Sequence, residues 1–430
     1  MSKKNINVGV IGCGNVGSSF IKGFISKKEI IKKKTGIEIN ILKVFDRDKN
    51  KLKLFKNVAA KSPDEIIYDK EIDIVVELIG GIDYAYEFVK KSIENKKSVV
   101  TANKALISKY GDEIFNLAKE KNVYIGFEAS VAGAIPIIKS LKESFIGNKI
   151  TKILGILNGT TNFILSEMFY KKIKFSEALN MAKKLGYAEA NPKLDISGFD
   201  TAHKILILSY ISFGNLFSID NINVEGIEKI ESVDITYADE FGYRVKLLGI
   251  CKKEGNNIEI RVHPTLLPKN HLLSLVEGVN NAVYVEGDLI GKALFYGEGA
   301  GGNAASSSVI SDVVDISKKI ISENYLEENF NINEKISLKL FDEIETKYYF
   351  RFTAIDKPGV LAKISKILGD NNISISSVIQ KKDNPEKAVP IIMLTHMAKE
   401  KNVKKAIEEI NKLDDIKKET VMLRVEEFLF

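Results

Sequence analysis

Short apolar runs alternate with amphipathic stretches along the first 130 residues. Each apolar run has the length of one strand, and together they predict strands at Val8–Ile11, Ile39–Phe45, Ile72–Ile79, Ser98–Val100 and Val123–Phe127. The stretches between them, such as Tyr84–Glu94 and Asp112–Lys121, have the periodicity of helices. Because apolar strands separated by helices are typical of a parallel sheet covered on both faces, we expect an α/β domain here.

The pattern changes after residue 130. Helices should end at Gly186 and Gly214, since glycine readily adopts the left-handed conformation that ends a helix. The expected elements are a strand at Ile150–Leu157, a helix from about Thr160, helices at Ser176–Leu185, Ser197–Phe213 and Asn303–Ile321, and hairpins around Glu254–Asn257 and Glu286–Asp288. This mixture predicts an α+β domain.

The C-terminal part has a third pattern. Residues 322–346 are polar with weak periodicity and predict a connector. The segments after it predict, in order, a strand, a helix, two strands, a helix and a strand: Tyr348–Ile355, Val360–Asp370, Ile373–Gln380, Ala388–His396, Glu400–Lys412 and Thr420–Glu426. This βαββαβ order predicts a module of ferredoxin-like size.

The composition, 45% hydrophobic and 28% charged over 430 residues, is that of a globular protein. The net charge of +6 is spread along the chain, and no basic stripe indicates a nucleic-acid partner. Cys13 and Cys251 are far apart, which argues against a disulfide scaffold or a zinc site and fits a reducing compartment. Because the N-terminal apolar stretch is too short for a secretory signal and no run reaches the length of a membrane span, we expect a cytoplasmic protein without a membrane partner.

Gly12-Cys13-Gly14-Asn15-Val16-Gly17 is a GxGxxG motif between the first strand and a helix expected at Asn15–Phe24. The first glycine permits a tight turn, the second lets the main chain approach a pyrophosphate, and the third lets helix and strand pack closely. N–H groups at the helix N-terminus can then bind phosphate. A glycine-rich turn is the alternative, but the position between strand and helix favours a dinucleotide-binding loop.

The residue that binds the ribose should follow the second strand, where Asp46 and Arg47 stand. Asp46 would accept both ribose hydroxyls of NAD, and Arg47 would bind the 2′-phosphate of NADP. Asp46 comes 29 residues after Gly17 rather than about 20, because of a polar insert around Lys28–Gly36. Asp46–Lys49 also suits a simple turn, and the choice between NAD and NADP stays open.

Two polar islands follow apolar strands. Thr101-Ala102-Asn103-Lys104 ends a strand of the expected sheet, so Lys104 could reach a cofactor or a substrate carboxylate. The alternative is a surface lysine. Asn158–Asn162 stands between a strand and a helix, and it is either a helix cap or the lining of a pocket.

The densest polar group is Gly186–Asp195, followed by Asp200 and Lys204. Asp200 and Lys204 are four residues apart on an expected helix, where such pairs are ordinarily surface ion pairs. This helix continues as the apolar segment Ile205–Leu208, which makes Lys204 a candidate proton donor. We expect His203, beside it, to be a packed residue rather than a catalyst.

In combination, these blocks resemble the homoserine dehydrogenase family over roughly residues 5–320. The matching blocks are Gly12–Gly17, Thr101–Lys104, Glu128–Pro136, Asn158–Asn162, Gly186–Lys204 and Gly297–Gly301. The module around Asp356–Ala362 resembles an ACT domain, an amino-acid-sensing fold. The resemblance implies a Rossmann-type dinucleotide-binding domain at 1–130, a catalytic and dimerisation domain at 131–321 whose last helix returns to the first domain, a connector at 322–346 and an ACT regulatory domain at 347–430.

The resemblance also implies roles for single residues. Lys204 would exchange a proton with the substrate oxygen, Lys104 would orient the substrate near the nicotinamide, and Asp200 would tune Lys204. The implied substrate-binding residues are Glu189, Asp195, Tyr187 and Lys104. The implied cofactor-binding residues are Gly12, Gly14, Asn15, Val16, Gly17, Asp46, Arg47, Gly80, Thr101, Lys104 and Gly301. A monovalent cation, Na+ or K+, would be bound mostly by main-chain oxygens of Glu128, Val131, Gly133 and Ile135.

The chain departs from the family pattern at a few positions. Asn191 stands where the family usually has Asp, which softens the negative field of its loop. Ala134 replaces a frequent Gly, so the turn there must tolerate a Cβ. Glu298 stands where Pro is common, and Gly302–Ala305 replaces the usual Pro-Thr-Ala run. None of these changes removes a proposed catalytic group.

The expected function is the NAD(P)-dependent interconversion of L-homoserine and L-aspartate 4-semialdehyde in threonine and methionine biosynthesis, with feedback by threonine through the ACT domain. Such modules typically pair, so we expect a homodimer or homotetramer. Two alternatives stay open. Another Rossmann amino-acid dehydrogenase is disfavoured by the Gly186–Lys204 block, and an inactive amino-acid sensor by the joint retention of Lys104, Glu189, Asp200 and Lys204.

Overall fold

The computed structural model describes residues 5–322, 336–381 and 388–427. It divides into two compact units. The first comprises Met1–Ile153, His203–Asn221 and Asn280–Lys335, and the second comprises Leu154–Ala202, Ile222–Val279 and Ile336–Phe430. The boundaries cut β6 (Ile150–Ile156) and α10 (Phe199–Phe213). Most of the expected connector, residues 323–335, lies outside the described residues.

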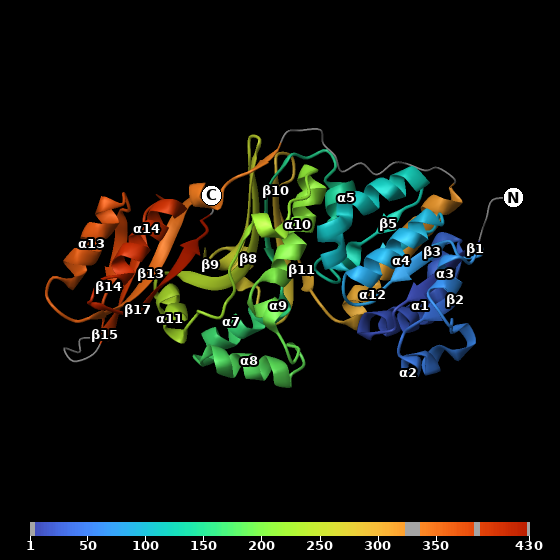
Figure 1. Cartoon of the computed structure of the whole chain (residues 1–430), viewed down its shortest axis with the longest axis horizontal. Coiled ribbons are helices and arrows are strands. Elements are labelled where there is room, and N and C mark those ends of the chain that lie inside the picture. The colour runs from blue at the N-terminus through green and yellow to red at the C-terminus, as the bar shows by residue number, and fades with distance from the viewer. Residues whose placement is uncertain (1–4, 323–335, 382–387, 428–430) are drawn as a thin grey trace. The chain divides into compact units, whose positions relative to one another are not determined.

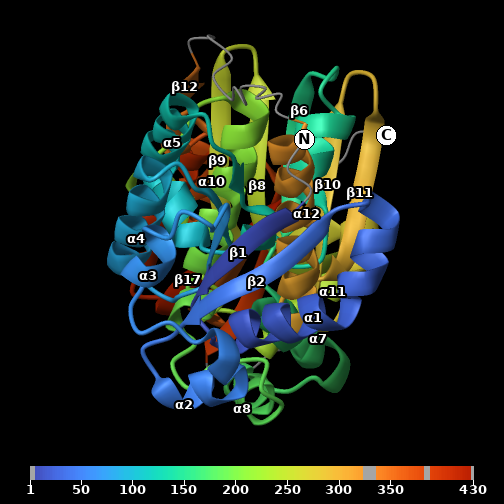
Figure 2. The ribbon, with the colours of Figure 1, turned by 90° about the vertical axis from the view of Figure 1, so that its right-hand side faces the viewer.

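A parallel sheet forms the centre of the first unit and confirms the expected α/β class. Its strand order is β2-β1-β3-β4-β5, and the strands are β1 (Asn5–Ile11), β2 (Glu38–Phe45), β3 (Ile74–Glu77), β4 (Ser98–Thr101) and β5 (Ile125–Gly126). β1 pairs with β2 on one side (Figure 2) and with β3 on the other. The chain order therefore reverses at β1 and β3, and ligands of such sheets bind beyond the carboxyl ends of the strands at that point.

Helices cover this sheet: α1 (Asn15–Thr35), α4 (Asp83–Glu94), α5 (Lys104–Lys121) and α12 (Gly302–Ile321) (Figure 1). α1 and α12 share one core, in which Phe20 and Phe24 pack with Val309 and Val313. The expected end of the first helix at Phe24 is wrong, because the polar insert around Lys28–Gly36 is itself helical. These residues continue α1 to Thr35, with the lysines on its outer face, and Gly36 ends the helix at φ 73°.

One sequence-based helix start also changes. α5 begins at Lys104 rather than at Asp112, because the Asn103 side chain caps it. The remaining elements of the first unit are short helices and a hairpin: α2 (Lys49–Leu52), η1 (Lys53–Val58), α3 (Asp64–Ile67), η2 (Glu128–Ser130), α6 (Ile137–Lys139), η3 (Ser140–Ser144), η4 (Ile219–Asn221), β10 (Asn280–Gly287) and β11 (Gly291–Glu298). The β10–β11 hairpin turns at Gly287, as expected.

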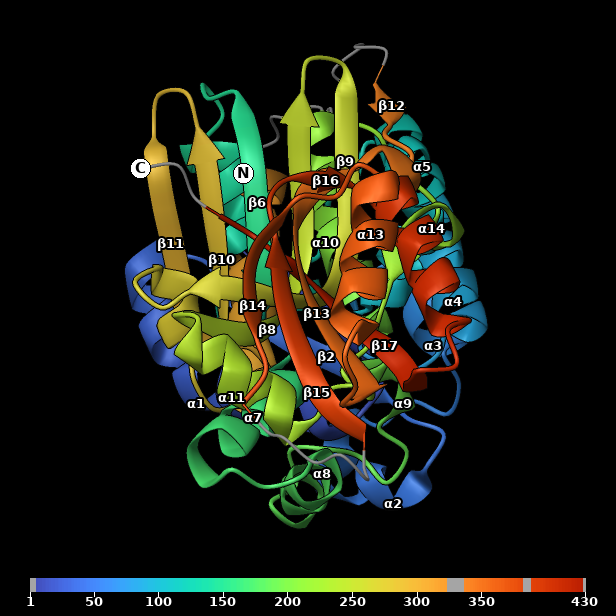
Figure 3. The ribbon, with the colours of Figure 1, turned by 90° about the vertical axis from the view of Figure 1, so that its left-hand side faces the viewer.

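The second unit contains a mixed sheet to which the C-terminal module contributes strands (Figure 3). Neighbouring strands are β8 (Tyr243–Glu254), β9 (Asn257–Pro268), β17 (Ile416–Val425), β13 (Glu345–Ile355), β15 (Ala388–Thr395) and β14 (Ile375–Ile379), in that order. Short strands β7 (Asn223–Val224) and β12 (Ser337–Leu338) pair with β9, and β16 (Ala398–Lys399) pairs with β13. β17 runs parallel to β9, with Arg424 opposite Thr265.

The expected βαββαβ order of the C-terminal module is confirmed. α13 (Val360–Asp370) and α14 (Glu400–Asn411) pack on one face of its strands, around Phe350 and Phe352. On the other face, Tyr349 and Arg351 bond to α11 (Ser232–Glu240), a helix that the hydrophobic pattern did not reveal.

The other helices of the second unit are α7 (Gly159–Lys171), α8 (Phe175–Lys184), α9 (Lys193–Ile196) and η5 (Leu272–Leu275). Gly186 follows α8 with φ 76°, the left-handed conformation expected there. Among the residues that the structure describes, every helix is too short or too polar to cross a membrane.

Candidate active site

The glycine loop follows β1 at the point where the strand order reverses. A Cβ on Gly12, whose φ is +108°, would lie 2.6 Å from the Leu78 carbonyl group, and a Cβ on Gly17 would lie 2.0 Å from the Gly12 oxygen. Both positions therefore require glycine. Gly14, the N-cap of α1, has open space around its Cβ position, and no side chain caps the helix. The first turn of α1 thus presents its N–H groups, with Asn15 and Val16 at its start, to an open surface suited to a pyrophosphate.

The end of β2 is fastened to this loop by Asp46. One carboxylate oxygen of Asp46 accepts the N–H of Cys13 at 2.6 Å, and the other accepts the N–H of Asp48 at 2.8 Å. Arg47, the next residue, lies with its guanidinium carbon 4.0 Å from the centre of the Tyr84 ring. Stacking of this kind fixes the plane of a guanidinium while its edges can still donate hydrogen bonds. A fixed cation therefore stands at the expected ribose position.

Glu77, at the end of β3, is a buried acid that sequence reasoning missed. Its carboxylate accepts the Thr101 hydroxyl at 2.6 Å and the N–H of Ile79 at 2.8 Å. Burial raises the pKa of Glu77 to about 7. The one signal in the sequence is that an otherwise apolar strand ends in an acid. This side chain joins the carboxyl ends of β3 and β4, and Gly80 follows three residues later.

Asn103 holds the start of α5 in place. Its amide donates to the Gly81 carbonyl at 2.6 Å and accepts the N–H of Leu106 at 3.1 Å. Lys104 is therefore the first residue of a capped helix, at the carboxyl edge of the sheet. One turn later, the Ser108 hydroxyl lies 2.6 Å from Nδ1 of His203, the neighbour of Lys204.

α5 and α10 also pack through stacked rings, with the Phe115 and Tyr210 centroids 5.9 Å apart. Lys204 is only 8% exposed. His203 is half-buried and hydrogen-bonded, which agrees with its expected packing role. In the first unit, α5, which begins with Lys104, is therefore joined by a hydrogen bond and by ring stacking to the segment of α10 that carries Lys204.

In the second unit, one amide brings together two of the expected site carboxylates. Nδ2 of Asn158 donates to Oδ1 of Asp195 at 2.7 Å and to Oδ2 of Asp200 at 2.8 Å. Asn158 is 5% exposed and caps α7 through the N–H of Thr161. The sequence left open whether Asn158–Asn162 caps a helix or lines a pocket. The Asn158 side chain caps α7 and also contacts two expected site residues.

Tyr187 is held by the same turn of α7. The Thr160 hydroxyl donates to the Tyr187 carbonyl at 2.6 Å, and the Phe163 ring meets the Tyr187 ring edge-on at 5.0 Å. Glu189, two residues later, is exposed.

The loop from Glu128 to Ile135 is held largely by its own first residue. Glu128 is 2% exposed, and its carboxylate accepts the N–H groups of Ile138 and Lys139 at 2.9 and 2.8 Å. Its own N–H donates to Asp312 at 2.8 Å, and burial together with the Asp312 charge raises the pKa of Glu128 to about 7. The Glu128 side chain is thus used inside the protein, and a cation would have to rely on main-chain oxygens.

The main chain of this loop turns at Ala132 and Gly133, both with φ 55°, directly after Val131. Ala134 is outside the left-handed region, so the turn tolerates its Cβ as the sequence requires. The Gly133 carbonyl accepts the Ser308 hydroxyl at 2.6 Å. Nowhere in residues 5–322, 336–381 and 388–427 do three or more His, Cys, Asp or Glu side chains gather as a metal site.

A second residue that sequence reasoning missed, Asn281, lies on β10 against the late glycine loop. Asn281 is fully buried, and its amide has no hydrogen-bond partner. A Cβ on Gly299 would lie 1.9 to 2.2 Å from this amide, so glycine is required there. Gly301, with φ +119°, precedes α12, and a Cβ on Gly302 would meet the Ser19 hydroxyl of α1 at 2.2 Å. The loop therefore lies directly against the helix that follows the cofactor motif.

Comparisons with known proteins agree on one family. Residues 136–314 match the family model "Homoserine dehydrogenase", residues 12–128 match "Homoserine dehydrogenase, NAD binding domain", and residues 348–415 match "ACT domain". The homoserine dehydrogenase of Neisseria gonorrhoeae is 43% identical over 431 residues, which cover 98% of this chain and 99% of that protein.

Solved structures give the same result. A homoserine dehydrogenase from Thiobacillus denitrificans superposes with a TM-score of 0.93 at 42% identity, over 99% of this chain and 100% of that one. A hyperthermophilic archaeal homoserine dehydrogenase in complex with NADPH matches 73% of this chain and 98% of its own, with a TM-score of 0.63 and 30% identity.

Proposed function

This chain belongs to the homoserine dehydrogenase family, and we propose that it interconverts L-homoserine and L-aspartate 4-semialdehyde in threonine and methionine biosynthesis, with NADP as its cofactor. The observation that carries the proposal is the pair of carboxylates, Asp195 and Asp200, held on one amide nitrogen. Two acids gathered in this way suit the ammonium group of an amino-acid substrate. A dehydrogenase acting on an uncharged alcohol would have no use for them.

Each site residue has a chemical task in this proposal. Glu189, Asp195 and Asp200 attract the substrate ammonium, and Tyr187 supplies an aromatic wall beside them. Lys104 orients the substrate, and Lys204 gives a proton to the aldehyde oxygen or, in reverse, takes it from the homoserine hydroxyl. The bound nicotinamide supplies or accepts the hydride at the same carbon.

Replacement of Lys204 tests the catalytic assignment. Lys204→Met should lower kcat about 1000-fold, as expected for the loss of a general acid, with an unchanged urea midpoint. Lys183→Met, at an exposed lysine of α8, is the control and should keep parental turnover. Parental turnover in Lys204→Met would refute the assigned role. A parent without activity on aspartate semialdehyde would instead favour the amino-acid sensor.

The preference for NADP rests on Arg47. Its stacking on Tyr84 fixes a cation beside Asp46, where a 2′-phosphate would add two negative charges. The archaeal relative was solved with NADPH. Arg47→Gln should therefore lower kcat/KM for NADPH about 10-fold and leave kcat/KM for NADH nearly unchanged. An equal loss with both cofactors would contradict the preference.

A monovalent cation, Na+ or K+, is proposed for the main-chain oxygens of Glu128, Val131, Gly133 and Ile135. The two left-handed residues at the turn of this loop support the proposal, because they change the direction in which successive main-chain carbonyl groups point. The Gly133 carbonyl oxygen accepts the Ser308 hydroxyl, and its second lone pair would bind the cation. The thermal midpoint should be higher in NaCl or KCl than in a bulky organic chloride of equal ionic strength. Equal midpoints in all three salts would contradict the site.

Feedback by threonine is proposed to act through the ACT domain, at the loop Asp356–Gly359. Asp356 there accepts a hydrogen bond from Gln380 at 3.0 Å. Deleting the domain is a poor test, because β17 pairs with β9 and its removal would expose that strand. In the full chain, Asp356→Ala should raise the half-inhibitory threonine concentration about 10-fold without changing kcat. A parent that does not respond to threonine would refute the proposal.

A homodimer or homotetramer is also proposed, because ACT modules typically pair. Sedimentation equilibrium tests this by measuring the molar mass of the protein in solution. The cytoplasmic location is proposed from the two cysteines, Cys13 and Cys251, which are buried as thiols rather than joined in a disulfide.

A further inference from the structure

We propose that Asn158 is a positioning residue that orients Asp195 and Asp200, the two carboxylates proposed to bind the substrate ammonium. It acts from the first turn of α7 and does not touch the substrate itself. The inference rests on the substrate roles proposed above for Asp195 and Asp200. It adds a neutral side chain whose task is to set the distance and direction of two acids.

The orientation of the Asn158 amide follows from its surroundings. Its oxygen accepts the N–H of Thr161 at 2.8 Å. If the amide were turned over, its NH2 group would face that N–H and its oxygen would face two carboxylates, so all three contacts would be repulsive. The NH2 group therefore faces Asp195 and Asp200, and each of its hydrogens meets one acid, at 2.7 and 2.8 Å.

The two acids come from different elements. Asp195 is on α9 and Asp200 is on α10, and the chain turns between them at Gly198 with φ +86°. Like charges that lie close together repel, and a shared donor offsets part of that repulsion. Because Asn158 is neutral, it binds both acids without neutralising the charge of either one. A Lys here would neutralise one charge, and an Asp would add a third.

The turn that carries Asn158 cannot shift easily. A Cβ on Gly159 would lie 2.5 Å from the Val279 oxygen, so the main chain of α7 lies in direct contact with that segment. The next residue, Thr160, bonds the Tyr187 carbonyl at 2.6 Å, two residues before Glu189. The same turn therefore holds the loop that carries Glu189, the third carboxylate proposed to bind the substrate ammonium.

Two substitutions at Asn158 separate positioning from capping. Asn158→Ser and Asn158→Asp keep an oxygen that can cap α7 and lose the NH2 group. The KM for homoserine should rise about 10-fold in Asn158→Ser and further in Asn158→Asp, as expected for lost bonds to charged groups. The KM for NADP+ should stay at the parental value in both variants, and the urea midpoint should stay at the parental value in Asn158→Ser, which adds no buried charge. A purely structural role would change the midpoint and both KM values together.

Asn148→Ser is the matched control. Asn148 lies just before β6. Its amide accepts the N–H of Ile290 at 2.7 Å and donates to the Phe145 carbonyl at 3.4 Å, so it too bonds main-chain groups. This variant should keep the parental KM for homoserine.

A double-mutant cycle tests the contact itself. Asn158→Asp combined with Asp195→Asn restores one amide beside one carboxylate and returns the number of acids to two. The fold increase in its KM for homoserine should be smaller than the product of the fold increases in the two single variants. A fold increase equal to that product would show that the two residues act independently and would overturn the inference.

The single acid variants distinguish this inference from the proposed function. Parental KM values in both Asp195→Asn and Asp200→Asn would overturn the substrate roles and this inference with them. Raised KM values in those two variants, with parental values in both Asn158 variants, would overturn this inference alone.

Discussion

At the scale of single residues, the site depends on buried polar side chains that hold other groups in place. Glu77 joins β3 to the Thr101 hydroxyl, and Asn158 joins α7 to two acids. Buried polar groups of this kind stabilise a structure only when their hydrogen bonds are complete, which both examples satisfy. Asn281 is an exception, since its buried amide has no hydrogen-bond partner.

Glu77 predicts a specific dependence of stability on pH. Its pKa in the folded chain is about 7, whereas an ordinary glutamate titrates at 4.5. The folded chain therefore holds this proton more tightly, so its contribution to stability is complete below the ordinary pKa and is lost as the pH rises through about 7. Between about pH 5 and about pH 8, the parent should lose about 2 kcal/mol of unfolding free energy relative to Glu77→Gln.

Urea unfolding of both proteins at the two pH values measures this difference. Glu128 titrates in the same range and is present in both, so it cancels. An equal pH dependence of parent and variant would contradict the raised pKa.

At the scale of elements, the proposed catalytic lysines are placed by the packing of α5 against α10. Lys104 begins α5 because Asn103 caps it, and Ser108 one turn later bonds His203, next to Lys204. This hydrogen bond fixes the rotation of one helix relative to the other. The positions of both ammonium groups depend on that rotation.

Loss of the Ser108–His203 hydrogen bond should slow the reaction. Ser108→Ala and His203→Leu should each lower kcat about 5-fold, the effect of one ordinary hydrogen bond, and the double variant should be no slower than either. Ser317→Ala is the control, because that hydroxyl bonds only within its own helix, to the Val313 carbonyl. Additive losses in the double variant would show that the two side chains act separately.

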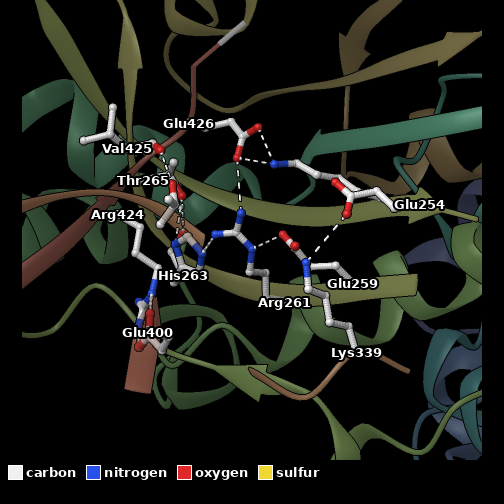
Figure 4. A network of polar contacts seen from close by, with 12 residues as sticks. Glu254, Glu259, Arg261, His263, Thr265, Lys339, Glu400, Arg424, Val425 and Glu426 are labelled. Atoms are coloured by element: carbon white, nitrogen blue, oxygen red, sulfur yellow. Dashed lines mark hydrogen bonds and ion pairs between the residues drawn. The ribbon is translucent and has the colours of Figure 1, made fainter. Parts of the chain in front are cut away.

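At the scale of the molecule, the ACT domain is joined to the rest of the second unit by buried charge as well as by strand pairing. Arg261 of β9 donates to Glu259 and to Glu426, the residue after β17, at 2.6 and 3.2 Å (Figure 4). Arg261 also donates to Nε2 of His263 at 2.6 Å. Burial and the neighbouring Arg424 and Arg261 hold the pKa of His263 well below its ordinary value, so this ring is neutral and can accept.

Arg351 makes a second connection. Its guanidinium donates to both oxygens of Asp234, at 2.7 and 3.1 Å, and to Glu231 at 2.9 Å. Asp234 also accepts the N–H of Glu231 in the capping box of α11. A residue of the ACT domain therefore completes the N-terminus of a helix outside it.

Arg351→Met should destabilise the chain by about 3 kcal/mol, because the fully buried Asp234 would lose its cation. Lys229→Met is the matched control. Lys229 pairs with Glu419, but the two side chains are 78% and 71% exposed, and such surface pairs contribute little. Urea midpoints compare the two variants, and equal midpoints would contradict a structural role for the Arg351 contact.

The sequence by itself determined the parts of this protein that depend on local pattern. Apolar periodicity predicted the strands of the parallel sheet and the βαββαβ order, because buried faces repeat every two or 3.6 residues. The glycine loop was equally clear, since only glycine fits at Gly12 and Gly17. Boundaries were less certain: α1 continues through a lysine-rich stretch because its buried face needs few apolar residues.

Only the tertiary structure decided which side chains hold the site together. Thr101 bonds Glu77 across 24 residues, Asn158 bonds Asp200 across 42, and Arg351 bonds Asp234 across 117. Local pattern predicts that such residues are polar within apolar surroundings, but it does not name their partners. A buried donor must find an acceptor wherever the fold brings one near, and that is set by the packing of the whole chain.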